Sequence, residues 1–395
     1  MEKFVFYAPT EIVFGRDTEL QVAKQIGKWN GSKVLIVYGG GSVVKSGLLN
    51  RIETVLDEAG IAYKAIGGVK PNPRLSFAEM GVKEAVQFGS DFILAVGGGS
   101  VIDTAKGIAI GSVYPEEKLW DIWTGKVKVT KALPVGVILT ISAAGSEMSS
   151  SAVLTNEETG KKSGLGTELN RPKFAIMNPE LTYTLPKYQV ACGIVDIMMH
   201  TLERYFTTVP SGNQMTDEIA EGLLRTVIEN GRKAYANQND YDATSEIMWC
   251  GSLSHNDITG LGRPRDFTVH KFGHELSAKF DTAHGASLSA MWGTWARHVC
   301  ELDYPRFQRY AEKVWGICIE DAKEAALAGI EATEHYFKEL NMPICLGDLE
   351  AGVLSEEMLL ELSERTTNYG AIKIGNFKKL DTQEVYEIYK KANHA

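Results

Sequence analysis

Two patterns of apolar and polar positions follow each other along the chain. Before residue 186, short apolar runs alternate with amphipathic stretches, which predicts strands alternating with helices. The predicted strands cover residues 33–38, 62–66, 92–96 and 135–140, and predicted helices include residues 51–58 and 77–88. Elements in this order are typical of βαβ units and a parallel sheet. Because the first and third of these runs are almost entirely apolar, we expect both faces of those strands to be covered.

After Pro186 the pattern predicts helices only. Apolar spacing and helix propensity predict them over residues 189–207, 215–234, 244–253, 305–316, 320–339 and 355–366. Pro186 is a natural boundary, because proline disrupts the interior of both a helix and a central strand. We therefore expect an α/β dinucleotide-binding domain over residues 1–186 and an all-helical domain over residues 187–395. No low-complexity linker separates them, so we expect the domains to pack directly and form a cleft.

Length and composition are those of an ordinary folded protein. At about 150 residues per domain, 395 residues correspond to two or three domains, and 44% apolar residues exclude a disordered chain. The net charge of −9 argues against nucleic acid or an anionic membrane as the main partner. No apolar stretch reaches the roughly 18–20 residues of a membrane span, and the first residues do not form a signal peptide. Five scattered cysteines without a C-x-x-C pair indicate a reducing compartment, and we expect the cytoplasm.

Two glycine-rich turns each follow a predicted strand and precede a helix-like stretch. They are Gly39–Gly41, followed by Ser42, and Gly97–Gly99, followed by Ser100. Backbone without Cβ lets a phosphate approach closely, and the next helix offers free N–H groups. We expect Ser100 to cap its helix and Asp103 to lie in the first turn. The alternative is that both are only tight turns. Neither is a G-x-G-x-x-G fingerprint, so the domain is predicted to be Rossmann-like rather than an ordinary Rossmann domain.

The first glycine turn also bears on the choice of nicotinamide cofactor. Sites for NAD usually place a carboxylate on the adenosine ribose at the end of a strand of this kind. Here that position offers only Gly39, Gly40, Ser42 and, one turn later, Lys45. Small residues, a hydroxyl and a cation suit a 2′-phosphate, which a carboxylate would repel. NADP(H) is therefore preferred over NAD(H), although Lys45 by itself could be a solvated helix residue.

A group of histidines in the second half predicts a metal site. Asp196 and His200 are four residues apart, so on a helix they share a face. His270 and His274 are also four residues apart, and His284 follows ten residues later. One carboxylate and three imidazoles suit Fe(II) or Zn(II) and leave a coordination position open for substrate. Spacing leaves open whether His270 or His274 is the ligand. The remaining histidines are expected to be structural or solvent-exposed: His255, His298, His335 and His394.

Taken together, these motifs resemble the iron-containing (group III) alcohol dehydrogenases, and most closely the butanol dehydrogenase and broad-range aldehyde reductase branch. The resemblance runs through the whole chain. It is carried by the segment 9–15 (PTEIVFG), both glycine turns, the segments 70–73 (KPNP), 100–106 (SVIDTAK), 145–148 (GSEM) and 178–182 (NPELT), and the aspartate and histidines named above.

The resemblance implies a dehydroquinate synthase-like architecture with an all-α metal-binding domain and a homodimer. It places the metal on Asp196, His200, His270 and His284, with His274 beside the site. It implies NADP(H) binding by the residues Gly39, Gly40, Ser42, Asn72, Gly98, Gly99, Ser100, Asp103, Thr140, Lys162 and Leu181. The chain departs from the usual family pattern over residues 262–267 and 291–295, where we expect Phe267 and Trp292 to form apolar walls for the substrate.

The expected reaction is reversible hydride transfer between NADP(H) and a primary alcohol/aldehyde pair of the butanol/butanal kind. In this reaction the metal in the cleft is expected to bind the substrate oxygen. His274 is expected either to relay a proton or to have a structural or ribose-facing role. The alternative is a related metallo-enzyme acting on a phosphorylated polyol or a cyclic substrate, such as a polyol-phosphate dehydrogenase or a dehydroquinate synthase-like lyase. Arg263, Arg265 and Lys271 would then bind the phosphate. The sequence leaves open the physiological substrate, iron versus zinc, and the direction of the reaction.

Overall fold

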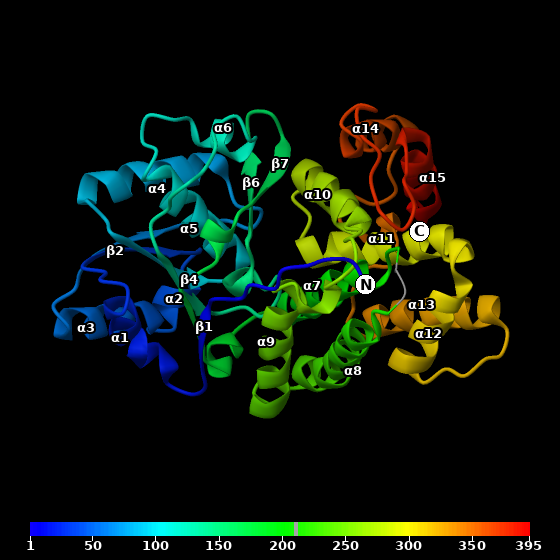
Figure 1. The fold of residues 1–395 in the computed structure, drawn as a ribbon, viewed down its shortest axis with the longest axis horizontal. Helices are drawn as coiled ribbons and strands as arrows, with labels where there is room; N and C mark the ends of the chain where they lie inside the picture. Colours follow the sequence, from blue (N-terminus) through cyan, green and yellow to red (C-terminus); the bar gives the residue numbers. More distant parts are fainter. Residues whose placement is uncertain (209–211) are drawn as a thin grey trace. The chain divides into compact units, whose positions relative to one another are not determined.

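The structure, a computed structural model, describes residues 1–208 and 212–395 (Figure 1). It contains two compact units. One comprises Tyr7–Leu185, and the other comprises Pro186–Ala395 together with the first six residues, Met1–Phe6. The N-terminal strap belongs with the helical unit because it hydrogen-bonds there: the N–H of Glu2 donates to the carbonyl of Gly262 at 2.9 Å.

The α/β unit contains the predicted parallel sheet. Its six strands lie in the order β1-β8-β5-β4-β2-β3, all parallel, and a separate antiparallel pair is formed by β6 and β7. The strands are β1 (Glu11–Phe14), β2 (Lys33–Tyr38), β3 (Ala62–Gly67), β4 (Phe92–Gly97), β5 (Val135–Leu139), β6 (Ser151–Asn156), β7 (Lys161–Gly166) and β8 (Phe174–Met177). The helices are α1 (Val22–Gly27), α2 (Ser42–Lys45), α3 (Leu48–Glu58), α4 (Leu75–Phe88), α5 (Gly99–Gly111) and α6 (Leu119–Trp123).

Both faces of the central strands are buried, as their apolar runs predicted. Alternate residues such as Val34, Ile36 and Leu94 join one core cluster with α1, α2 and α3. The residues between them, such as Leu35 and Ile93, are equally buried on the other face. The four predicted strands end within one residue of β2, β3, β4 and β5. The strands β1, β6, β7 and β8 were not predicted. The strands β1 and β8 have only four residues each, β7 contains glycine and lysine in place of an apolar run, and β6 begins and ends with polar residues.

The order of the strands identifies where this sheet should bind a ligand. From β2 the chain continues through α2 and α3 to β3 on one side, whereas from β4 it continues through α5 to β5 on the other side. In open α/β sheets, ligands bind outside the carboxyl ends of the strands where the connections diverge in this way. The strands β2 and β4 are direct neighbours, with Tyr38 paired to Val96. The two glycine-rich turns therefore leave the sheet side by side at this point.

The second unit is helical throughout its named elements, as predicted. Its helices are α7 (Lys187–Tyr205), α8 (Gln214–Ala236), α9 (Tyr241–His255), α10 (Thr268–Phe280), α11 (His284–Val299), α12 (Tyr304–Trp315), α13 (Ala322–Glu339), α14 (Glu356–Thr366) and α15 (Thr382–Ala392). Six of them match predicted segments to within about three residues. The helices α10, α11 and α15 were not predicted. In α11 nearly every side chain is buried, so the alternation of polar and apolar faces that reveals a surface helix is absent.

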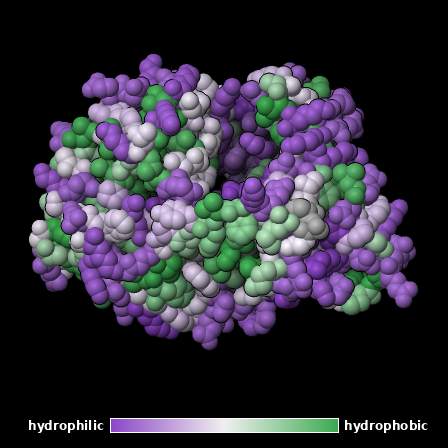
Figure 2. Space-filling model, in the orientation of Figure 1, coloured by the Kyte–Doolittle hydropathy of each residue, from purple (hydrophilic) through white to green (hydrophobic). Residues whose placement is uncertain are grey.

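The surface agrees with the acidic, polar composition of the sequence. In the view of Figure 2 most of the visible surface is hydrophilic, and hydrophobic residues gather in a few patches. Within the described part of the chain, none of the helices combines the length and the apolarity that crossing a bilayer requires.

Candidate metal and nucleotide sites

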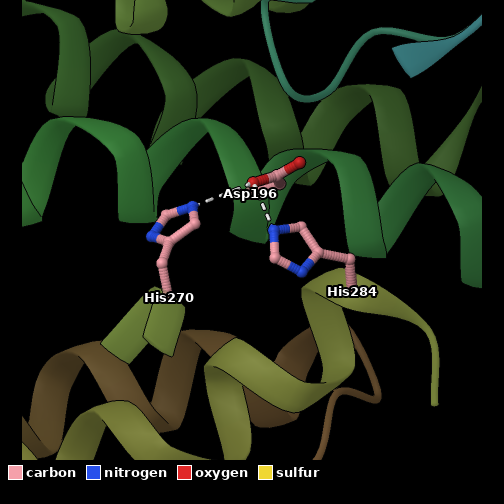
Figure 3. Close-up of side chains that lie close together, drawn as sticks. All are labelled: Asp196, His270 and His284. Carbon is pink, nitrogen blue, oxygen red and sulfur yellow. Dashed lines mark ion pairs between the residues drawn. The ribbon is translucent and has the colours of Figure 1, made fainter. Parts of the chain in front are cut away.

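Three of the predicted metal ligands converge from three helices of the helical unit (Figure 3). Asp196 comes from the middle of α7, His270 from the first turn of α10, and His284 is the first residue of α11. The Nε2 atoms of His270 and His284 each lie 3.8 Å from Oδ1 of Asp196. The ligand atoms of the three residues all lie within 4.8 Å of one another. One carboxylate and two imidazoles in this arrangement form an N/O donor set for a divalent cation.

The chemistry of these donor atoms fits a metal. Oδ1 of Asp196 and Nε2 of His270 are buried and form no hydrogen bond among the described residues, although Nδ1 of His200 lies 3.0 Å from that oxygen. At 3.8 Å they are also too far apart to bond to each other. A buried polar atom left unsatisfied costs about 1–3 kcal/mol, which a cation between the two atoms would offset. The fit therefore rests on unsatisfied atoms as well as on residue types.

His200, the fourth predicted ligand, lies beside this cluster. Its Nδ1 is 2.9 Å from the carbonyl oxygen of Asp196, one helical turn earlier, and 3.0 Å from Oδ1 of the same residue. Its ring packs on that of His270, with ring centroids 4.4 Å apart. Because Nδ1 is engaged within α7, Nε2 is the nitrogen of His200 that remains for a metal.

His274 lies one turn after His270 and packs against the same cluster. Its ring stacks on that of His284, with centroids 5.6 Å apart and an angle of 26° between the ring planes. The structure therefore brings all five predicted residues of this group together.

Burial and neighbouring charges determine the protonation of the cluster. Burial alone would raise the pKa of Asp196, but the charges of His200 and His284 hold it well below its usual value. Asp196 is thus ionised at neutral pH and ready to bind a cation. Burial lowers the pKa of His200, and its contact with Asp196 only partly opposes this. A neutral imidazole is the form that binds a metal.

In the α/β unit, glycines of the two predicted turns are present for different physical reasons. A Cβ on Gly97 would lie 2.5 Å from Cγ2 of Val101, and one on Gly98 would lie 2.9 Å from Cβ of Ile141, so packing already requires glycine there. At Gly40 a Cβ would meet nothing within 4 Å, and its φ angle is not positive. Neither packing nor backbone conformation explains Gly40. A ligand that approaches the backbone closely would explain it.

The expectations that Ser100 caps a helix and that Asp103 lies in its first turn are both wrong. Helix α5 begins at Gly99, its N-cap is Gly98, and no side chain caps it. Ser100 therefore lies in the first turn, because the chain enters the helix directly from the glycine turn. The free N–H groups at the start of this 13-residue helix face the point where the connections diverge, which suits a phosphate.

Other predicted cofactor residues also gather around the carboxyl ends of the strands. Nζ of Lys162, on β7, donates to Oδ1 of Asn72 at 3.0 Å. The N–H of Thr140, which follows β5, donates to the carbonyl of Gly97 at 3.1 Å, beside the second glycine turn. Leu181 lies in a short 3-10 helix, Pro179–Thr182, directly after β8.

Asp103 uses both of its carboxylate oxygens inside the protein. Oδ1 accepts a hydrogen bond from Oγ of Ser146 at 2.6 Å, and Oδ2 accepts one from the N–H of Val153 at 2.9 Å. In this structure Asp103 therefore shapes the segment that leads into β6. Its charge also faces Lys106, one turn later on α5.

Lys106 is a buried cation that the sequence analysis did not single out. Only 1% of it is exposed, and its Nζ donates to three carbonyls, those of Ser146, Ser149 and Ser151, at 2.8, 3.1 and 2.8 Å. Burial lowers its pKa to about 8, and the charge of Asp103 opposes this shift. Lys106 thus holds the segment before β6 against α5.

Replacing Lys106 with methionine is expected to destabilise the α/β unit by about 2–4 kcal/mol, because the three carbonyls lose a buried charged donor. Urea unfolding followed by circular dichroism measures this loss. The control is Lys83→Met on the exposed face of α4, for which we expect a change within about 0.5 kcal/mol. Equal stability of the two variants would show that the buried amine contributes nothing to the fold.

Comparison with known proteins identifies the family. Residues 9–179 match the profile of the iron-containing alcohol dehydrogenases, and residues 190–393 match the C-terminal profile of the same family. The chain belongs to the iron-containing alcohol dehydrogenase family. As a member, it is an NAD(P)-dependent oxidoreductase of alcohols and aldehydes, and membership implies a divalent metal.

Full-length relatives of this alcohol dehydrogenase differ in the cofactor that their names give. It is 39% identical to NADH-dependent butanol dehydrogenase A of Clostridium acetobutylicum, covering 99% of this chain and 100% of that protein. It is 35% identical to the NADPH-dependent aldehyde reductase YqhD of Escherichia coli over 99% and 100% of the two chains. The crystal structure of NADH-dependent butanol dehydrogenase A from Thermotoga maritima superposes with a TM-score of 0.94 at 36% identity, covering 100% and 99% of the two chains.

The two aromatic residues predicted to line the substrate site have different surroundings in this alcohol dehydrogenase. The expectation for Trp292 is wrong: it is fully buried in the helical core, 6.2 Å in ring centroid distance from Phe337. Phe267 does lie beside the predicted metal ligands, with its ring centroid 5.1 Å from that of His270. Its backbone is left-handed (φ 57°), an uncommon conformation for a bulky residue. The carboxylate of Asp266 holds this turn by accepting from the N–H groups of Thr268 and Phe377.

Sequence reasoning missed two residues that contact the predicted ligands. Glu203 is fully buried and pairs with Nδ1 of His270. It follows Asp196 and His200 at the i, i+4, i+7 spacing of one helix face, a signal that could have identified it. His255 packs its ring 4.1 Å from that of His200, and its Nδ1 lies 3.3 Å from Nη2 of Arg204. Burial, with the nearby charges of His200 and Arg204, holds the pKa of His255 well below its usual value.

Proposed function

We propose that this alcohol dehydrogenase catalyses reversible hydride transfer between NADP(H) and a primary alcohol/aldehyde pair of the butanol/butanal kind, with a broad range of substrates. The proposed metal ligands are Asp196, His200, His270 and His284. The observation that carries the proposal is the pair of buried, unsatisfied atoms on Asp196 and His270 that face the imidazole of His284. We also infer a cytoplasmic homodimer, which light scattering on the purified protein tests for its oligomeric state.

Each group of the chain has a separate task in this proposal. When bound, a divalent cation, Fe(II) or Zn(II), supplies Lewis acidity that polarises the substrate oxygen and favours the alkoxide form of an alcohol. The chain contributes one negative charge to the site through Asp196. Phe267 supplies an apolar surface next to His270, which suits the alkyl chain of a substrate. His274, stacked on His284, is the group we propose to relay the proton, because an imidazole titrates near neutrality.

Charges around the first glycine turn support the preference for NADP(H). The segment 38–47 (YGGGSVVKSG) contains one lysine and no acid. The N–H of Gly68 donates to the carbonyl of Gly39 at 3.1 Å, so the loop after β3 runs beside this turn. That loop, 67–74 (GGVKPNPR), adds a lysine and an arginine and also contains no acid. Lys45 and Lys70 would thus offer positive charge to a 2′-phosphate, whereas the charge of Arg74 acts on Glu157. The carboxylate typical of NAD sites is absent from both segments.

The phosphorylated-substrate alternative loses support from the same structure. The guanidinium of Arg263 is buried against Asp217, and its Nη2 donates to the carbonyl of Thr259 at 3.1 Å. Arg265 forms an ion pair with Asp257 at 2.8 Å. Two of the three cations that would have bound a substrate phosphate are therefore engaged within the protein.

Steady-state reduction of butanal by metal-reconstituted protein tests the reaction and the cofactor together. We expect turnover with kcat/KM for NADPH at least about tenfold above that for NADH, equivalent to about 1.4 kcal/mol. Gly40→Asp adds a carboxylate where a Cβ would meet no protein atom within 4 Å, and relative to the asparagine control below we expect it to weaken NADPH use selectively. Gly40→Asn is the control, since it has nearly the same shape without the charge.

Two outcomes would contradict parts of this proposal. An unmodified protein that prefers NADH would refute the inference from the glycine turn and leave the reaction class intact. An absence of turnover with either cofactor, in protein shown to contain metal, would refute the proposed alcohol/aldehyde substrates.

A further inference from the structure

The carboxylate of Glu203 receives three N–H donors from the start of helix α10. Its Oε1 accepts from the backbone N–H groups of Val269, at 2.6 Å, and His270, at 3.2 Å. Its Oε2 pairs with Nδ1 of the His270 ring. Glu203 is fully buried on α7, seven residues after Asp196. One side chain thus contacts both the backbone and the ring of a proposed metal ligand.

This arrangement determines which nitrogen of His270 carries the proton. An ionised carboxylate only accepts hydrogen bonds, so Nδ1 of His270 must be the donor in the pair. In the neutral imidazole the other nitrogen, Nε2, then has a free lone pair. Nε2 is the atom that lies 3.8 Å from Oδ1 of Asp196 and has no hydrogen-bond partner among the described residues. When the ring is neutral, as metal binding requires, the lone pair is therefore on the nitrogen that faces the other proposed ligands.

We infer that Glu203 is a positioning residue that fixes the tautomer and the ring orientation of His270 for a divalent cation. The inference rests on the proposed function, because it assumes that His270 binds a metal. The two backbone hydrogen bonds add a second effect: they hold the first turn of α10 against α7 and so set the distance between His270 and Asp196. Carboxylates that orient a ligating histidine in this way typically change metal affinity 10- to 100-fold.

Glu203→Gln distinguishes this role from simple packing. The two backbone N–H groups require an acceptor, so the amide oxygen must take the place of Oε1. The amide NH₂ then faces Nδ1 of His270, which can only accept from it. The proton moves to Nε2, and the lone pair no longer faces Asp196. The variant keeps the size of the side chain and the two backbone hydrogen bonds, and reverses the tautomer alone.

The measurement is the dissociation constant for Zn(II), determined by competition of the metal-free protein with a chromophoric chelator. We expect a 10- to 100-fold weaker affinity for Glu203→Gln, with a far-UV circular dichroism spectrum like that of the unmodified protein. The control is Glu221→Gln. Glu221 is an equally buried carboxylate in the same unit, and it accepts from Tyr205 and Arg309 rather than from a histidine. The affinity of the Glu221→Gln variant for Zn(II) should stay within about twofold of that of the unmodified protein.

The outcomes separate this inference from the proposed function. Zn(II) affinity equal to that of the unmodified protein in Glu203→Gln, or an equal loss in Glu221→Gln, would overturn the positioning role and leave the metal site standing. Failure of the unmodified protein to bind Zn(II) would overturn both. If Glu203→Gln does not fold, ¹⁵N NMR of the zinc-loaded unmodified protein decides: we expect a proton on Nδ1 of His270, and zinc on Nδ1 would refute the inference.

Discussion

Asp196→Ala is expected to abolish stoichiometric metal binding and to lower kcat/KM for butanal reduction by at least about 10³-fold, equivalent to about 4 kcal/mol. Asp196 has the central position in the cluster: the imidazole nitrogens of His270 and His284 both face its Oδ1 at 3.8 Å. Among the described residues, three form this candidate metal group, and Asp196 is the only acid of the three. Without it, three imidazoles would have to hold a divalent cation with no charged ligand in direct contact with it.

Two measurements check this expectation independently. Metal content by elemental analysis reports on binding, and the nicotinamide absorbance reports on turnover. The matched control is Asp242→Ala, which removes an exposed carboxylate from the first turn of α9 and should change neither quantity. Normal metal content with normal turnover in Asp196→Ala would remove the basis for the proposed site.

Gly285→Ala is expected to lower the free energy of unfolding by about 3 kcal/mol and to weaken metal binding severely. A Cβ at Gly285 would lie 2.3 Å from the carbonyl oxygen of Cys192 and 2.6 Å from its Cα. These are backbone atoms within α7, so they cannot rotate away as a side chain would. The helix α11 must therefore move away from α7, at a cost typical of overpacking. Because His284 precedes Gly285 directly, this movement separates His284 from Asp196.

Thermal denaturation and Zn(II) affinity measure the two parts of this effect. The control is Gly222→Ala in α8, where a Cβ would meet only the flexible end of Arg225 at 3.8 Å. Alanine there should stabilise the helix by up to about 1 kcal/mol, since it has the higher helix propensity. A melting temperature and a metal affinity like those of the unmodified protein in Gly285→Ala would show that α7 and α11 do not need this close approach.

Local patterns predicted the fold well where burial follows a simple period. The strands β2 and β4 are apolar because helices cover both faces of the sheet, and their ends were predicted to within one residue. The same reasoning failed for α10 and α11, which carry His270 and His284. In α11 the side chains are buried all round, and in α10 a histidine is buried where the helical period calls for an apolar residue. The residues of the proposed metal site thus obscure the pattern of the helices that carry them.

By itself the sequence determined the residue types of the site, the shared helix face of Asp196 and His200, the glycine turns after two apolar strands, and the resemblance to the family. Only the tertiary structure decided that Asp196, His270 and His284 converge, that Glu203 reaches His270, and that Trp292 belongs to the core. The reason is physical. Helical and strand periods relate residues a few positions apart, whereas residues from α7, α10 and α11 meet through the packing of whole helices. Contacts such as that of Gly285 with Cys192 determine this packing.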